Sequence, residues 1–179
     1  MSSDKLRAAY IQWLPRKKWN FFLTIKFNTT SSLEAARTNF KRLCQALDRK
    51  LIGPKYGRRN RRRTLIVVAS EHIHSNFHFH GMLKLCCKRR PKRRRLEKLL
   101  DKLWKRILPS GSVDLQRLCD AKGAAGYMTK ELFVPEGMDR LLWSSEFWHH
   151  EDCKEKKRRR SKDDDRSKKD RHSRSHRRR

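Results

Sequence analysis

The stretch Thr64–Leu85, TLIVVASEHIHSNFHFHGMLKL, contains two apolar segments separated by a short polar turn. Thr64–Glu71 is rich in β-branched residues, which is typical of a buried strand, and Phe77–Leu85 largely alternates between apolar and polar residues. The segment His72–Asn76, in which four of five residues are polar, predicts the turn between them. We therefore expect a hairpin of two neighbouring strands in an antiparallel sheet.

The segments around this hairpin complete a β-α-β-β-α-β order. Aromatic and β-branched residues over Trp19–Asn28 predict a first strand. Apolar residues at steps of three and four predict a helix from Leu33 to Leu51, and Ser31 with Glu34 matches a capping box at its start. The elements expected after the hairpin are a helix over Leu96–Ile107, a strand over Ser112–Leu118, a helix over Ala121–Leu132 and a fifth strand over Arg140–Trp148.

This order predicts an α+β fold of the ferredoxin-like or RRM-like class. Such a split β-α-β arrangement has an antiparallel sheet, here of four or five strands, with helices packed on one face. The other face is then free to hold a ligand. We assign residues 1–150 to this domain. Residues 151–179 contain no aliphatic or aromatic side chain, so we expect a disordered tail rich in Arg and Lys.

The charge of the chain points to a polyanionic partner. Its 179 residues include 48 Lys and Arg against 19 Asp and Glu, a formal net charge of +29. The tail holds 15 of these basic and 7 of these acidic residues, so the domain itself is strongly basic. Such an excess favours nucleic acid. Because the sequence has no P-loop motif, no membrane-spanning apolar run and no secretory signal, we expect an intracellular protein that is not an ATP-driven motor.

The second strand of the hairpin contains a candidate metal site. Strand alternation places His78 and His80 on one face, about 6.6 Å apart along the strand, so that both imidazoles can converge on one ion. Glu71 joins them if it pairs opposite His78, whereas a shift of one residue would turn it away. Two nitrogens, one carboxylate and open positions suit Mg²⁺ or Mn²⁺. The alternative is a pair of polar histidines on a solvated face.

The segment Gly123–Leu132, GAAGYMTKEL, contains a candidate nucleophile. Tyr127 and Lys130 are three residues apart on the expected helix and can meet. A tyrosine beside a divalent ion can attack a phosphodiester, because the ion polarises the phosphate. Lys130 can stabilise the phosphate charge or favour the phenolate. Taken alone, the pair is better explained as a boundary tyrosine whose hydroxyl is solvated.

Together these segments resemble the HUH endonucleases, and among them the single-tyrosine initiators of rolling-circle replication (Rep proteins). Phe22–Phe27, FLTIKF, is similar to the first motif of the family, FLTxTF, with Lys26 where threonine is commoner. His78-Phe79-His80 matches its His-hydrophobic-His motif, and Tyr127–Lys130, YMTK, resembles its YxxK motif. The motifs occur in the order of the family, and the resemblance extends over about residues 18–132.

The resemblance implies a domain that nicks and joins single-stranded DNA at a replication origin. In such proteins the tyrosine becomes linked to the 5′ phosphate and leaves a 3′ hydroxyl that primes synthesis. It implies Tyr127 as nucleophile with Lys130 assisting, and His78, His80 and Glu71 as metal ligands. The implied partners are a host helicase and polymerase. The pattern is closer to plasmid and phage initiators, in a bacterial cytoplasm, and a eukaryotic viral protein would act in the host nucleus.

Two basic runs flank the hairpin. Arg58–Arg63 precedes its first strand and Lys88–Arg95 follows its second, so both lie at one end of the hairpin, while Glu71 and His78 lie at the other. DNA could then be held by phosphate contacts at one end and cut at the other. The residues expected to bind nucleic acid are Lys26, Arg58, Arg59, Arg61, Arg62, Arg63, Arg89, Arg90, Arg93 and Arg94.

Two other functions fit parts of the sequence. A single-tyrosine HUH transposase or relaxase would share the ion and the nucleophile and would differ in the DNA it acts on. A non-catalytic RRM-like module that binds RNA has the same order of elements. That module needs aromatic side chains on the free sheet face, whereas Phe77 and Phe79 share a face with Leu83 and Leu85, and the histidines take the free face.

Overall fold

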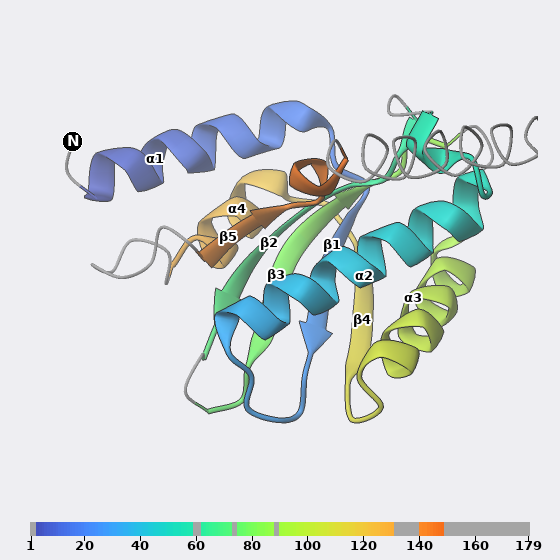
Figure 1. Cartoon of the computed structure of the whole chain (residues 1–179). Helices are drawn as coiled ribbons and strands as arrows, with labels where there is room; N and C mark the ends of the chain where they lie inside the picture. The colour runs from blue at the N-terminus through green and yellow to red at the C-terminus, as the bar shows by residue number, and fades with distance from the viewer. Residues whose placement is uncertain (1–2, 59–61, 73–74, 88–89, 131–139, 149–179) are drawn as a thin grey trace, which may run out of the picture. The chain divides into compact units, whose positions relative to one another are not determined.

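The structure, a computed structural model, describes residues 3–58, 62–72, 75–87, 90–130 and 140–148 (Figure 1). The chain divides into two compact units, residues 1–146 and 147–179. The described part of the first unit contains a five-stranded sheet and four α-helices. The tail expected over 151–179 lies outside the described residues. No described helix combines the length and the apolar character that crossing a membrane requires.

Every strand of the sheet is antiparallel to its neighbours, in the order β4-β1-β3-β2-β5. The order of the first four strands is that of a split β-α-β arrangement, so the α+β class and the antiparallel sheet are confirmed. The expected fifth strand is shorter than predicted, because a 3-10 helix (η5, Ser144–Phe147) follows it. The strands are β1 (Phe21–Lys26), β2 (Leu65–Glu71), β3 (His78–Lys84), β4 (Ser112–Arg117) and β5 (Leu141–Trp143).

The helices differ from the prediction at several ends. The N-cap of α2 is Ser32, whose hydroxyl accepts a hydrogen bond from Ala35 N at 3.2 Å, and not Ser31. Arginine is a good helix former, and α3 accordingly begins within the run that was expected to be a loop. The N-terminal helix α1 was not predicted. The helices are α1 (Ser3–Trp13), α2 (Leu33–Ile52), α3 (Arg93–Ile107) and α4 (Ala121–Met128), with 3-10 helices η1 (Leu14–Lys17) and η2 (Tyr56–Arg58).

Helices α2 and α3 cover one face of the sheet, which we call the helix face (Figure 1). The centre of its core is formed by five fully buried rings, which are Phe27, Phe40, Phe77, Phe79 and Trp104. The Phe79 ring centroid lies 5.4 Å from that of Phe27 and 5.7 Å from that of Phe40, and Trp104 lies 5.0 Å from Phe27. The Trp104 indole also donates a hydrogen bond to the Lys26 carbonyl at 2.9 Å. Burial of these aromatic side chains is a main source of stability.

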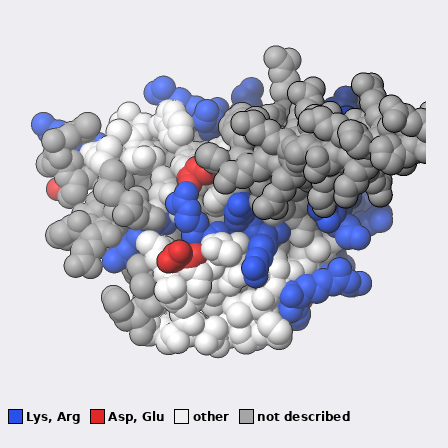
Figure 2. Space-filling view, in the orientation of Figure 1, with Lys and Arg blue, Asp and Glu red and all other residues white. Residues whose placement is uncertain are grey.

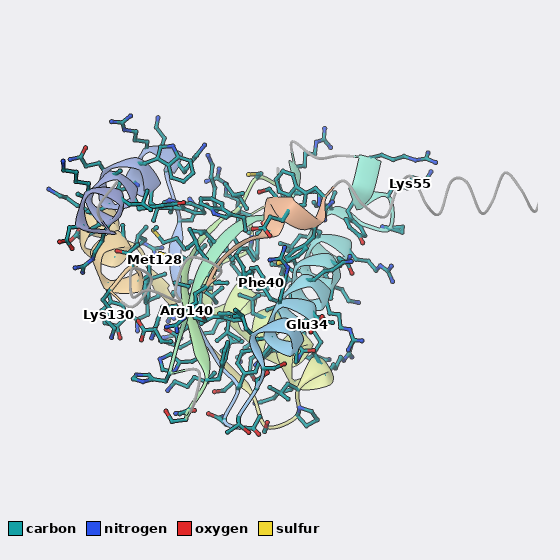
Figure 3. All side chains as sticks on the ribbon, turned by 60° about the vertical axis from the view of Figure 1, so that its left-hand side comes forward. Glu34, Phe40, Lys55, Met128, Lys130 and Arg140 are labelled. Carbon is teal, nitrogen blue, oxygen red and sulfur yellow. The ribbon has the colours of Figure 1, made fainter. Side chains whose placement is uncertain are left out.

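The opposite face, which we call the histidine face, carries His78, His80 and Met82 of β3. Contrary to the prediction of helices on one face only, α1, η1 and α4 pack against this face as well. The reason is that β2 and β3 are apolar here too: Val67, Ala69 and Met82 are fully buried and form a cluster with residues of η1 and α4. Figure 3 shows Met128 of α4 on the side of the sheet opposite to Phe40 of α2.

Candidate metal centre

Glu71, His78 and His80 form a cluster at the end of the β2–β3 hairpin. Glu71 pairs directly opposite His78, which is the register that the predicted metal site requires. The ring centroids of His78 and His80 lie 4.7 Å apart. One ligand atom from each of the three residues lies within 4.8 Å of the other two. This group could therefore hold a metal ion.

Both histidines are oriented through their Nδ1 atoms. His78 Nδ1 donates a hydrogen bond to the Asn76 carbonyl at 2.8 Å, so the Nε2 atom of a neutral His78 bears the lone pair. His80 Nδ1 lies 3.1 Å from the Thr24 hydroxyl. Each Nε2 atom lies 3.4 Å from Glu71 Oε2. Metal-binding histidines are commonly held in this way, with one nitrogen bonded to the protein and the other directed at the ion.

The Glu71 carboxylate is buried without the hydrogen bonds that such a group normally requires. Glu71 is 1% exposed, and neither of its carboxylate oxygens has a hydrogen-bond partner among the described residues. In addition to the two histidines, Lys130 Nζ lies 3.4 Å from Oε2. A buried carboxylate without hydrogen bonds is unfavourable unless positive charge compensates it. A metal ion held by this group would supply such charge.

His80 is held in the form that binds a metal. Burial, followed by the nearby charges of His78, Lys130, His72 and Lys26, lowers the pKa of His80 from 6.5 to about 4. At neutral pH the imidazole is therefore uncharged, and no proton competes for its lone pair.

Helix α4 brings Tyr127 to this cluster. The Tyr127 ring meets the His80 ring edge-on, with 4.9 Å between the centroids, and is 46% exposed. Lys130 Nζ lies 4.4 Å from the Tyr127 ring centroid, so Lys130 contacts both Tyr127 and Glu71. Lys130 lies in the turn after α4 and not on the helix as predicted, because α4 ends at Met128 and Thr129 is its C-cap.

Two residues of β1 complete the surroundings of His80 and were not predicted. Thr24 pairs opposite His80 and supplies the hydroxyl beside its Nδ1 atom. The Phe22 ring stacks on His80 with 5.8 Å between centroids, and it lies 6.1 Å from the Tyr127 ring. Alternation along β1, which places both residues on the same face as Lys26, is the signal that could have identified them.

The predicted nucleic-acid-binding residues lie in different environments. Arg63 is 2% exposed, and its Nε atom lies 2.8 Å from Asp48 Oδ2, so Arg63 forms a buried ion pair and not the expected surface contact. Arg93 is half-buried and donates to the Leu115 carbonyl at 2.7 Å. Exposed among the predicted residues are Lys26, Arg58, Arg62, Arg90 and Arg94, while Arg59, Arg61 and Arg89 lie outside the described residues.

The hairpin separates the exposed arginines from Glu71, His78 and His80, which we call the candidate metal-ligand cluster. Leu65 pairs with Lys84 at the end where the flanking basic runs join the strands, and Glu71 pairs with His78 at the other end. The pairing of β2 with β3 therefore confirms that the two basic runs join the strands at one end and that Glu71 and His78 lie at the other.

Comparisons of the chain with protein-family models, with curated proteins and with solved structures give no match.

Proposed function

We propose that this protein is a metal-dependent endonuclease that nicks and joins single-stranded DNA through a covalent tyrosine intermediate, in the manner of the single-tyrosine initiators of rolling-circle replication. The observation that carries the proposal is the convergence of Tyr127 and Lys130 on Glu71, His78 and His80. These side chains come from β2, β3 and the end of α4. Each of them can take part in the attack of a tyrosine on a phosphodiester, either as nucleophile, as metal ligand or by stabilising charge.

In this proposal Glu71, His78 and His80 hold a divalent ion. One carboxylate and two nitrogens, with positions left for water and phosphate oxygens, favour Mg²⁺ or Mn²⁺. When bound, such an ion polarises the phosphate and neutralises the charge that develops on it. The hydrogen bonds at the Nδ1 atoms hold the two imidazoles in place before the ion binds, so that little reorganisation is needed.

Tyr127 is the nucleophile. Its phenol loses a proton to solvent, its oxygen forms a bond to phosphorus, and the bond between phosphorus and the 3′ oxygen breaks. The 3′ oxygen takes up a proton and becomes a free hydroxyl, while the 5′ phosphate remains on Tyr127. Lys130, whose ammonium lies over the Tyr127 ring, stabilises the phenolate and the phosphate charge. Attack by a 3′ hydroxyl on the phosphotyrosine reverses the reaction and joins the strands.

The surroundings of Tyr127 support a single strand as substrate. Tyr127 is accessible, Phe22 offers a partly buried ring beside it, and Lys26 is exposed on the same face. Aromatic rings and basic side chains together are what single strands bind. At a replication origin, a host helicase and polymerase would use the free 3′ hydroxyl. Transposases and relaxases of the HUH group would use the same residues, so the sequence of the DNA that is cut separates these functions.

An RNA-binding module is less well supported. Such a module stacks bases on several aromatic side chains of its central strands. Of the residues of β1 and β3 on the histidine face, Phe22 alone has a benzene ring, and it stacks on His80. An RNA-binding role would also leave the buried Glu71 carboxylate without a purpose.

Covalent trapping tests the proposal. The full chain is incubated with a pool of randomised single-stranded DNA and Mn²⁺, and the products are separated on a denaturing gel. We expect a protein–DNA band that a chelator and Tyr127→Phe both abolish. The chain has only two other tyrosines, so Tyr10→Phe and Tyr56→Phe are matched controls that should retain the band. A band that survives Tyr127→Phe would contradict the assignment of the nucleophile.

A second measurement separates binding from chemistry. Mn²⁺ binding is measured by electron paramagnetic resonance for the wild type and for a variant with His78→Ala and His80→Ala. We expect the wild type to bind the ion and the double variant to lose most of this affinity. If both proteins bind Mn²⁺ equally, the cluster is not the metal site and the catalytic proposal fails.

A further inference from the structure

We infer that the solvent side of α3 is a second nucleic-acid site, which binds the phosphate backbone of duplex DNA. This surface belongs to the helix face, whereas Tyr127 and the candidate metal-ligand cluster belong to the histidine face. The choice of DNA over RNA rests on the proposed function, and the site itself rests on the distribution of charge around α3.

The side chains of α3 fall into three sectors around the helix axis, which differ in burial and charge. Leu96, Leu100, Leu103 and Trp104 are buried and form the first. Two acidic residues turned toward β4 form the second. The third faces solvent, and at 100° per residue it spans about 120° of the helix surface. It consists entirely of exposed basic side chains, which are Arg94, Arg95, Lys98, Lys102, Lys105 and Arg106.

The two acidic residues of α3 pair with one member of this basic sector, Lys105, and with Arg93 outside it. Glu97 Oε1 and Asp101 Oδ1 accept hydrogen bonds from backbone N–H groups of the edge strand β4, at 3.2 and 3.3 Å. Their other oxygens pair with Arg93 at 3.1 Å and with Lys105 at 2.8 Å. Both carboxylates are therefore held at the border with β4. Within the described part of the chain, no ion pair involves the five remaining basic residues of the sector.

The chemistry of this sector fits a duplex better than a single strand. Single strands are bound through base stacking on aromatic rings as well as through charge. The single aromatic residue of α3, Trp104, is fully buried and donates its indole N–H to the Lys26 carbonyl. What α3 offers to solvent is charge alone, which suits a sugar–phosphate backbone whose bases are paired.

The arrangement of the charges also matches a regular backbone. Arg94, Lys98 and Lys102 recur at intervals of four residues, which places them about 6 Å apart along a straight helix. Figure 2 shows blue side chains on the right-hand side of the molecule, where Figure 1 places α3, and shows no red ones among them. This row can follow successive phosphates of one strand.

The position of α3 connects the two sites. Helix α3 packs beside β4, which is the edge strand, and β1 is the only strand between β4 and His80 on β3. A duplex held by α3 would therefore lie next to the sheet edge, and a single strand that continues from it would cross β4 and β1 to reach Tyr127. On β1 that strand would meet Lys26 and Phe22.

Charge removal on α3 tests this inference. The test variant carries Lys98→Gln, Lys102→Gln and Arg106→Gln, which are exposed positions of α3, and glutamine keeps a similar helix propensity. The matched control removes three exposed charges from α1, η1 and α4 through Lys5→Gln, Arg16→Gln and Lys122→Gln. Binding of a blunt DNA duplex by the full-length proteins is measured by fluorescence anisotropy at several NaCl concentrations, after circular dichroism has verified that all three are folded.

We expect the α3 variant to bind the duplex about tenfold or more weakly than the wild type. The slope of its binding constant against salt concentration, on logarithmic scales, should fall by roughly 0.9 for each phosphate that the variant no longer neutralises. The control should bind less than about threefold more weakly. Equal weakening in both variants, or none in the α3 variant, would overturn the inference. Tighter binding of a duplex RNA that depends on the same three residues would overturn the assignment to DNA.

The two proposals can fail independently. Trapping of a short single strand by the α3 variant should match the wild type, because the substitutions leave Tyr127 and the cluster untouched. If the wild type traps no DNA and yet the α3 variant loses duplex binding, the proposed function fails and the α3 site stands. If trapping succeeds and duplex binding does not depend on α3, the reverse holds.

Discussion

Two buried carboxylates near the opposite ends of β2 have contrasting surroundings. Asp48 and Glu71 are each 1% exposed. Asp48 accepts hydrogen bonds from Arg63 Nε and from the Thr64 backbone N–H, both at 2.8 Å. Glu71 has no hydrogen bond among the described residues, and the nitrogens of His78, His80 and Lys130 lie 3.4 Å from its Oε2 atom.

The comparison teaches that burial alone does not mark a functional carboxylate. The hydrogen bonds of Asp48 are complete, and they fix the last turns of α2 to the residues that lead into β2, which is a structural role. Glu71 has no such hydrogen bonds within the described chain, and a metal ion held with His78 and His80 could supply the missing partner. The two positions should therefore respond to substitution in opposite ways.

The largest effect is expected at Asp48. Asp48→Asn removes the negative charge beside the buried Arg63 guanidinium, which should lower the free energy of unfolding by about 3–5 kcal/mol. Guanidinium denaturation followed by circular dichroism measures this loss. A loss below about 1 kcal/mol would show that Arg63 can turn to solvent. Arg63 would then regain its predicted role as a contact to DNA.

The next effect concerns the hydroxyl beside His80. Thr24→Val keeps the shape of the side chain and removes the hydrogen bond to His80 Nδ1, so the affinity for Mn²⁺ should fall by about 10- to 100-fold. Titration with Mn²⁺ measures the change, and Thr38→Val at an exposed position of α2 is the matched control. Unchanged affinity in Thr24→Val would mean that packing alone orients His80.

Much of the candidate metal-ligand cluster could be predicted because it depends on local pattern. Alternation along β3 separates the histidines from Phe77 and Phe79, and the short turn after Glu71 leaves few registers for the hairpin. The core residues of α2 and α3 follow from helical spacing in the same way. These features are set within one or two neighbouring elements, where sequence spacing determines position.

The features that could not be predicted depend on contacts between distant segments. Thr24 meets His80 only because β1 pairs with β3, and the two residues are 56 positions apart. The run Arg61-Arg62-Arg63 contains nothing that marks one arginine as buried, because its partner Asp48 lies on a preceding helix. Likewise, the cover of the histidine face by α1 arises from packing of a short helix whose own pattern is weak.

A smaller effect with the opposite sign is expected at Glu71. Glu71→Gln replaces a buried charge by an amide whose N–H groups can donate to the lone pairs of His78 and His80. In the presence of a chelator, the free energy of unfolding should rise by about 1 kcal/mol, while Mn²⁺ binding is lost. Denaturation and metal titration of the same protein measure both changes. Glu34→Gln, at an exposed position of α2, should leave Mn²⁺ binding intact.

A fall in stability for Glu71→Gln would contradict the contrast between the two carboxylates. It would mean that the ion pair with Lys130 already satisfies Glu71, as Arg63 satisfies Asp48.

The smallest effect tests whether the ion pair or its burial matters at Asp48. Lys105 and Asp101 on α3 lie 2.8 Å apart, the same distance as Arg63 and Asp48, but their side chains are 54% and 29% exposed. Water already solvates both charges, so Lys105→Gln should change the free energy of unfolding by no more than about 0.5 kcal/mol. The same denaturation experiment measures it. A loss near that of Asp48→Asn would mean that charge pairing itself stabilises this fold, and that burial does not make the Arg63–Asp48 pair more stabilising than the Lys105–Asp101 pair.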